Sequence, residues 1–171
     1  MAAIPYASLT VTPERLITYR SLNDFDRDVD ALQILSGTRR MDVALTTAKN
    51  ILRLEKSPER NIVILMTAGR QALGYRGTPL TDSGKEARNI GAEIYVVAIG
   101  SDPSVEELRP VVADSRDIYQ VGSFDYLKRE AQPIGKDIVD SKCRYILSFL
   151  QFSTEQNRFQ INLYDGKPAE A

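Results

Sequence analysis

Two apolar runs near the middle of the chain decide the fold: NIVILMTAGR at residues 61–70 and GAEIYVVAIG at residues 91–100. Within them, residues 62–66 and 93–99 are rich in β-branched side chains and continuously apolar instead of alternating. Strands of this kind are typical of a parallel sheet that is covered on both faces. A weaker strand of the same kind is predicted at residues 117–121 (DIYQV).

Helical periodicity surrounds these strands. The cleanest apolar stripe runs from Met41 to Leu52 and predicts an amphipathic helix. Another helix is predicted at residues 82–90, closed by Gly91. An earlier helix is predicted from the spacing of Phe25, Val29, Leu32 and Leu35, with Asn23 or Asp24 as its cap. Another helix begins at Ser104, which has Glu107 at capping-box spacing. A last helix runs from about residue 124 towards Cys143 and is kinked or broken near Pro133.

From residue 25 onward the order is helix, helix, strand, helix, strand, helix, strand, helix. This alternation predicts an α/β fold with a doubly wound, mostly parallel sheet and helices on both faces. Before it, residues 6–11 and 16–19 are predicted to form a hairpin. After residue 143, the tail is expected first to extend the last helix, and residues 159–164 alternate like an edge strand.

Composition excludes several classes of protein. The 171 residues are 43% hydrophobic and 26% charged, which suits one ordinary globular domain with a tail. The net charge of −1 offers no electrostatic basis for binding nucleic acid or an acidic membrane. No apolar run approaches the roughly 20 residues that span a bilayer, and the first residues lack the pattern of a signal peptide.

The chain contains no histidine and a single cysteine, Cys143. These counts exclude Ser-His-Asp and Cys-His catalysis, Cys-x-x-Cys sites and an internal disulfide. Residues 77–85 (GTPLTDSGK) do not form a phosphate-binding loop, because six residues separate the two glycines and Glu86 follows Lys85. The residues therefore argue against an enzyme.

Several segments, in order, resemble the von Willebrand factor type A domain family. Residues 37–45 (GTRRMDVAL) look like the family's Gly-Thr loop and the helix after it. Residues 61–70 look like its central strand ending in Thr-Asp-Gly, and residues 91–100 resemble its helix-end, strand and Ile-Gly segment. Residues 107–108 and 117–127 fit its final helix, strand and helix.

The resemblance implies a domain at residues 1–143 and a partly ordered extension at residues 144–171. The family's first strand, which ends in Asp-x-Ser-x-Ser and lies in the middle of the sheet, has no counterpart, and residues 6–19 stand for its second and third strands. A missing central strand leaves an apolar slot with unpaired backbone groups. Either another segment fills the slot or the chain is a fragment. Three phenylalanines of the tail are candidates for filling the slot: Phe149, Phe152 and Phe159. The alternative is that they pack in the ordinary way.

Family members often bind Mg²⁺ or Mn²⁺ through loop oxygens at the ends of strands, and a ligand carboxylate completes the coordination. Here Ala68 stands where the family has an aspartate, and only Thr38 keeps a suitable oxygen. One hydroxyl does not hold Mg²⁺ against its hydration shell. The resemblance thus implies a degenerate site without a cofactor, in which Thr38 is vestigial or a helix cap. It also implies that Cys143 occupies the place of a cysteine that extracellular members pair with one before the first strand.

Basic residues supply the remaining candidates for a binding site. Arg39, Arg40 and Arg70, with Arg76, are expected to form a rim at the carboxyl ends of the strands, where open α/β sheets bind ligands. The rim either binds an acidic protein or a sulfated glycan, or it is solvated charge, which the sequence favours. Tyr75 is an exposed contact residue or packs on the sheet.

The function implied by the resemblance is a non-enzymatic binding module of adhesion type, with a protein ligand such as a matrix protein, or a glycan, and an extracellular location. Two alternatives remain open: a small α/β enzyme or nucleotide-binding protein, and an assembly element that forms homo-oligomers through an open sheet.

Overall fold

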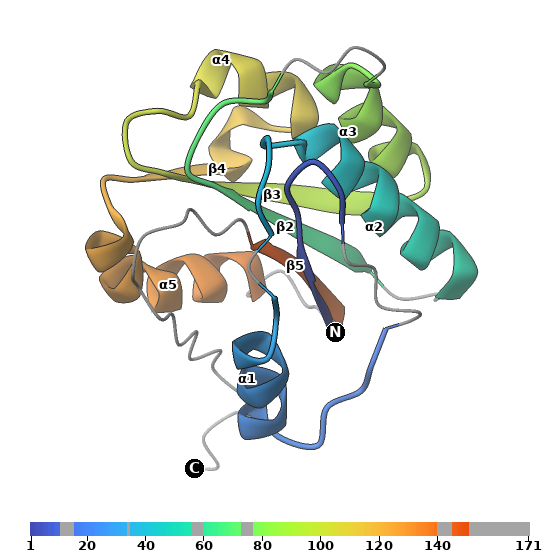
Figure 1. Ribbon diagram of the computed structural model, residues 1–171, viewed down its shortest axis with the longest axis vertical. Helices are drawn as coiled ribbons and strands as arrows, with labels where there is room; N and C mark the ends of the chain where they lie inside the picture. The colour runs from blue at the N-terminus through green and yellow to red at the C-terminus, as the bar shows by residue number, and fades with distance from the viewer. Residues whose placement is uncertain (11–15, 34, 56–59, 73–76, 140–144, 151–171) are drawn as a thin grey trace.

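The core of the molecule is a five-stranded parallel sheet with the order β1-β5-β2-β3-β4 (Figure 1). The computed structural model describes residues 1–10, 16–33, 35–55, 60–72, 77–139 and, as backbone, 145–150. The strands are β1 (Ala2–Pro5), β2 (Asn61–Thr67), β3 (Ala92–Ile99), β4 (Ile118–Val121) and β5 (Tyr145–Leu150).

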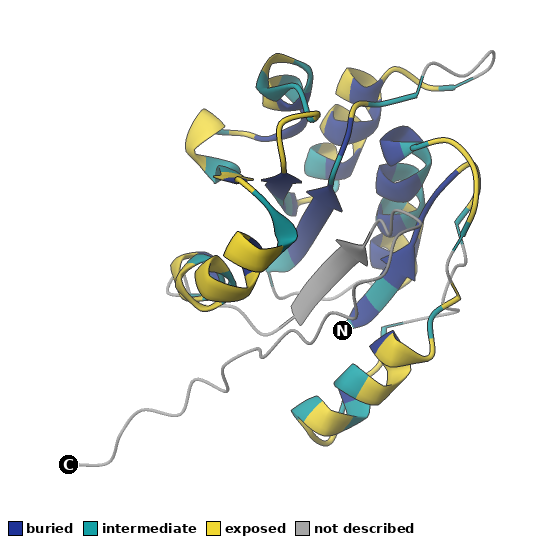
Figure 2. Cartoon of the chain, turned by 60° about the vertical axis from the view of Figure 1, so that its left-hand side comes forward, coloured by how far each residue is buried: buried dark blue, intermediate teal, exposed yellow. Residues whose placement is uncertain are grey.

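Helices cover both faces of this sheet (Figures 1 and 2). One layer contains α2, α3 and the short α4, and the other contains α1 and α5. The doubly wound α/β fold expected from the sequence is therefore confirmed. The helices are α1 (Leu22–Asp30), α2 (Met41–Glu55), α3 (Leu80–Asn89), α4 (Val105–Leu108) and α5 (Phe124–Val139), with short 3-10 turns at Arg109–Val111 and Ser115–Asp117.

Strand β2 shows why the decisive run is continuously apolar. Val63 and Leu65 belong to the core cluster under α2 and α3. Ile62, Ile64 and Met66 belong to the separate cluster under α1 and α5. Since successive strand residues point to opposite faces and both faces are covered, neither set tolerates polar side chains.

The predicted stripe of α2 is confirmed, because every member of it is buried: Met41, Ala44, Leu45, Ala48, Ile51 and Leu52. Other boundaries differ. Ser21 caps α1 by accepting a hydrogen bond from the Asp24 amide at 3.2 Å, and α1 ends at Asp30, before Leu32. Ser104 caps α4 as expected. Helix α5 continues through Pro133, so the break expected there does not occur.

The N-terminal hairpin prediction is wrong. The strand is Ala2–Pro5, which pairs in parallel with β5, and residues 6–10 close into a turn with an isolated bridge between Tyr6 and Thr10. Residues 16–19 form no strand; the Ile17 amide donates to the Met1 carbonyl at 2.9 Å. Pairing with β5 satisfies the backbone of residues 2–5, which local strand propensity did not reveal.

The prediction that the tail extends the last helix is also wrong. Residues Tyr145–Leu150 form β5, which lies between β1 and β2 and pairs with both. The central position that the sequence left empty is thus occupied by the C-terminal part of the chain. A strand in this place satisfies backbone groups on both neighbours, and this outweighs local helical propensity. The other tail features lie outside the described residues: Cys143, Phe152, Phe159 and residues 159–164.

Gly91, which follows α3, has a φ of +87° and no neighbouring atom within 4 Å of an added Cβ. We expect Gly91→Ala to lower the free energy of unfolding by about 1 kcal/mol, because the left-handed conformation strains an L residue. Gly135 is the matched control: it lies within α5, and an added Cβ there also meets nothing within 4 Å. Gly135→Ala should raise the stability by up to about 1 kcal/mol. Urea denaturation measures the stability of both variants. Equal effects of the two substitutions would contradict the left-handed conformation of Gly91.

Candidate functional site

The candidate site lies at the edge of the sheet where β1, β5, β2 and β3 end. In a parallel sheet these carboxyl ends meet at one edge, which is the usual position of ligand sites in open α/β folds. Arg39 precedes α2, Arg70 follows β2, and Asp102 follows β3. The guanidinium group of Arg39 lies against Gly69, where a Cβ would come within 2.4 Å of the Arg39 Cζ. Only glycine therefore allows Arg39 to take this place.

Arg39 and Arg70 converge on one acidic residue. The Nη2 of Arg39 donates to the Oδ2 of Asp102 at 3.4 Å, and the Nε of Arg70 donates to the Asp102 carbonyl oxygen at 3.3 Å. The side chains of Arg39 and Asp102 are 40% and 59% exposed. An exposed ion pair of this length is weak, so water or another carboxylate exchanges with Asp102 at little cost.

Arg40 is engaged elsewhere. Its Nε and Nη2 donate to the two carboxylate oxygens of Asp42 at 2.7 and 2.6 Å. The Nε2 of Gln71 also donates to Asp42 at 2.5 Å, and the Gln71 Oε1 accepts from the Met41 amide at 2.7 Å. The hydrogen bonds with Asp42 raise the pKa of Arg40. Asp42 is buried. Through Gln71, this network joins the start of α2 to the loop after β2.

Thr38 is held by the turn that follows β1. Its amide donates to the Oγ of Ser8 at 2.9 Å, and the two hydroxyl oxygens lie 3.1 Å apart. Nearby, the Thr67 hydroxyl donates to the Gly69 carbonyl at 2.9 Å. Tyr6 is buried and donates to the Met66 carbonyl at 3.0 Å, and burial raises the pKa of its phenol. These polar groups already have partners within the loops.

The described part of the chain contains no group of three or more Asp, Glu, His or Cys side chains that could hold a metal ion. At the edge, Ala68 supplies no side-chain oxygen, Thr38 is bonded to Ser8, and a guanidinium group lies beside Gly69. These residues do not fit a divalent cation, which needs several oxygen ligands and repels a fixed positive charge.

The structure brings Thr38, Arg39 and Arg70 to this edge and places Arg40 in the buried network; Tyr75 lies outside the described residues. Sequence reasoning missed Asp102. Its position just after the strand that ends at Ile99 was a usable signal, because such loops meet at the ligand-binding edge. Gln71 and Ser8 left no signal in the sequence, since their roles depend on contacts between distant segments.

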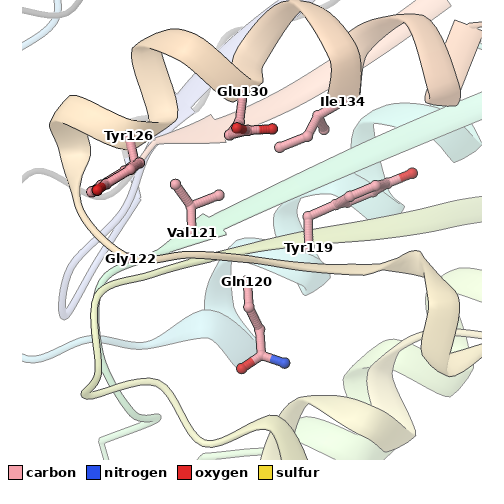
Figure 3. Close-up of a pocket in the computed structure, with 7 residues that line it drawn as sticks. All are labelled: Tyr119, Gln120, Val121, Gly122, Tyr126, Glu130 and Ile134. Atoms are coloured by element: carbon pink, nitrogen blue, oxygen red, sulfur yellow. The ribbon is translucent and has the colours of Figure 1, made fainter.

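A second candidate site is a hollow of about 250 Å³ between the edge strand β4 and α5 (Figure 3). Tyr119 and Val121 point from β4 towards α5, whereas Gln120 points to the other side of the strand. The Tyr119 hydroxyl donates to Asp137 at 2.5 Å, and burial, followed by this hydrogen bond, raises the pKa of the phenol. The groups around this hollow do not converge on a common point, so it is the weaker candidate.

Comparison with known protein families shows which family the chain belongs to. Residues 1–132 match the von Willebrand factor type A domain. The chain belongs to this family. The expected resemblance is thus confirmed. The matched residues end before β5, the strand that completes the sheet.

Solved structures of proximal thread matrix protein 1 from the mussel byssus resemble this von Willebrand A domain. One crystal form has a TM-score of 0.63 and 22% identity, covering 77% of this chain and 32% of that one. Another structure, with a zinc-occupied MIDAS motif, has a TM-score of 0.60, 20% identity and the same coverages. This chain therefore spans about a third of their length, and the likeness concerns the fold.

No curated protein matches the chain. Among the described residues, none of the helices has the length and apolar character needed to cross a bilayer.

Proposed function

We propose that this von Willebrand A domain is a protein-binding module of adhesion type that recognises a carboxylate of its partner through Arg39 and Arg70, without a divalent cation. The observation that carries the proposal is the convergence of two arginines from different loops on the exposed Asp102. The Asp102 carboxylate, which Arg39 binds beside Arg70, holds the place that a partner's carboxylate would take. The metal site is degenerate in this proposal, and Thr38 serves the loop.

Arginine suits this role. Its planar guanidinium carries a permanent charge and presents donors in a fork that matches a carboxylate. Gly69 lets the Arg39 guanidinium lie close to the end of β2, and Arg70 adds a second charge beside it. The edge thereby presents fixed positive charge where other family members place a metal ion. Arg40 is left out of the binding surface because Asp42 neutralises it.

The family supports the wider role that we propose. Von Willebrand A domains generally bind proteins and not substrates, and the similar mussel structures belong to a matrix protein. The chain also has no histidine to act as a general base near neutral pH. We therefore place the domain outside the cell, bound to a protein of the matrix or cell surface, without an enzymatic activity.

The proposal predicts that fluorescein-labelled hexaglutamate binds the full chain and that Arg39→Ala lowers its affinity about tenfold, the loss of about 1.4 kcal/mol expected when one charge-assisted contact is removed. Arg70→Ala should act in the same direction. Asp102→Asn should strengthen binding, because it removes the competing carboxylate. Fluorescence anisotropy at low salt measures each affinity, since exposed charges are screened at high salt.

Arg116 supplies the matched control. It is 88% exposed and precedes β4, at the amino edge of the sheet, so Arg116→Ala should leave hexaglutamate affinity unchanged. EDTA should also leave binding unchanged. Binding that requires Mg²⁺, or that falls equally in Arg39→Ala and Arg116→Ala, would refute the proposal. Tighter binding of a heparin hexasaccharide than of hexaglutamate would assign the rim to a sulfated glycan instead.

A further inference from the structure

We propose that β5 is an exchangeable strand: the slot between β1 and β2 also accepts the Tyr145–Leu150 segment of a second copy of this chain, which joins two copies by strand exchange. The slot is the interaction surface, and the partner is the same strand in trans. The inference is independent of the arginine rim.

The position of β5 in the sheet is the first observation. It is the last strand of the chain, yet it lies second in the sheet and pairs with β1 on one side and β2 on the other. The register runs from Asn61 opposite Tyr145 to Leu65 opposite Phe149. The strand also lies beyond residue 132, where the family match ends. A central strand has therefore been supplied from outside the matched domain.

The slot keeps contacts of its own between its two walls. The Tyr6 hydroxyl, just beyond β1, donates to the Met66 carbonyl in β2 at 3.0 Å and so bridges the two strands past the end of β5. The side chains of Ile4, in β1, and Leu65, in β2, lie in one core cluster. The Tyr6 hydrogen bond joins the two walls of the slot, and it does not depend on which copy provides the strand.

Helix α5, which precedes β5 in the chain, packs on one face of the sheet. Leu127 and Ile138 are buried there, and Phe124 and Ile134 are partly buried against the same core cluster. The Tyr119 hydroxyl of β4 also donates to Asp137 of α5. Each of these contacts is equally available in a second copy, so an exchange that moves α5 and β5 together regains them along with the strand pairing.

Exchange of this kind has a small thermodynamic cost. Identical contacts form in cis and in trans, so the balance depends on the entropy of association and on concentration. We therefore expect monomers in dilute solution and exchanged dimers as the concentration rises.

The test uses full-length single-cysteine variants in a Cys143→Ser background. Asn61 and Tyr145 stand opposite each other in the register, and neighbouring strands lie about 4.8 Å apart, within disulfide range. Chains with Asn61→Cys are mixed with chains carrying Tyr145→Cys at high concentration, incubated and oxidised. A disulfide-linked heterodimer on a non-reducing gel is expected only if the strand of one copy occupies the slot of the other.

The matched control mixes Asn61→Cys with Leu150→Cys, which is five residues out of register and about 16 Å away along the strand. The heterodimer should be lost in this mixture. The double variant Asn61→Cys/Tyr145→Cys reports the pairing in cis, and Ile64→Cys with Ser148→Cys repeats the test if the first pair misfolds. A disulfide that forms only within the double variant would overturn exchange, and absence of both disulfides would overturn the placement of β5.

Discussion

Replacing Arg40 by methionine is expected to lower the free energy of unfolding by about 3 kcal/mol, measured by urea denaturation at neutral pH. The reason is the carboxylate that it leaves behind. Asp42 is only 2% exposed, and Arg40 supplies both of the charged hydrogen bonds that compensate its burial. The neutral hydrogen bonds that remain, from the Gln71 side chain and the Val43 amide, do not offset a buried charge.

The loss of stability in Arg40→Met is expected to depend on pH. Burial acts to raise the pKa of Asp42, but the hydrogen bonds from Arg40 and Gln71 outweigh burial, and the folded-state pKa lies below the ordinary value of 3.8. A depressed carboxyl pKa stabilises the fold above the unfolded pKa, and this contribution is lost as the pH falls through the folded one. The difference between the wild-type chain and Arg40→Met should therefore shrink in acid.

Arg39→Met is the matched control for Arg40→Met, because Arg39 is the adjacent residue and its pairing with Asp102 is exposed. Its effect on stability should stay within about 0.5 kcal/mol. A double variant, Arg40→Met/Asp42→Leu, removes both charges and should recover part of the loss. If Arg40→Met and Arg39→Met were equally stable, the buried network would not be an important contributor to the fold.

Leu45→Ala is expected to cost about 2–5 kcal/mol of unfolding free energy, because it removes a buried side chain and leaves a cavity between α2 and the sheet. Leu45 is 0% exposed and lies in the larger core cluster. Leu54, in the same helix, is 76% exposed and is the matched control. Leu54→Ala should change the stability by no more than about 0.5 kcal/mol.

Leu45→Ala and Leu54→Ala remove the same atoms from the same helix, so the two variants differ only in the burial of the side chain. Chemical denaturation followed by circular dichroism measures both variants. A loss for Leu54→Ala as large as that for Leu45→Ala would mean that the outer face of α2 is covered, which would contradict the exposure of Leu54.

Local patterns were sufficient for most of the matched domain. The continuous runs in β2 and β3 and the stripe of α2 predicted elements that the structure contains, because burial on one or two faces imposes a period that is visible in the residues themselves. Boundaries were less accurate. Helix α1 begins with the cap at Ser21, not at Asn23 or Asp24, because several residues in that stretch are able to cap and residue type alone does not decide between them.

The site was predictable only in part. Arg39 and Arg70 follow motif positions at strand ends, so the sequence placed them near one edge of the sheet. It did not distinguish Arg39 from Arg40, which are adjacent and chemically identical. The difference arises from Asp42 and Gln71, which turn one guanidinium inwards, and from Gly69, which gives the other its place at the rim.

The residues alone determined that the chain is an α/β protein of parallel strands, and they predicted that arginines lie at the carboxyl edge of the sheet and that Ala68 replaces an expected aspartate. These are properties of period, order and residue type, which need no knowledge of distant contacts. Only the tertiary structure decided that the middle of the sheet is filled by Tyr145–Leu150. Strand pairing joins backbone groups far apart in sequence, and a short apolar segment does not reveal its neighbours.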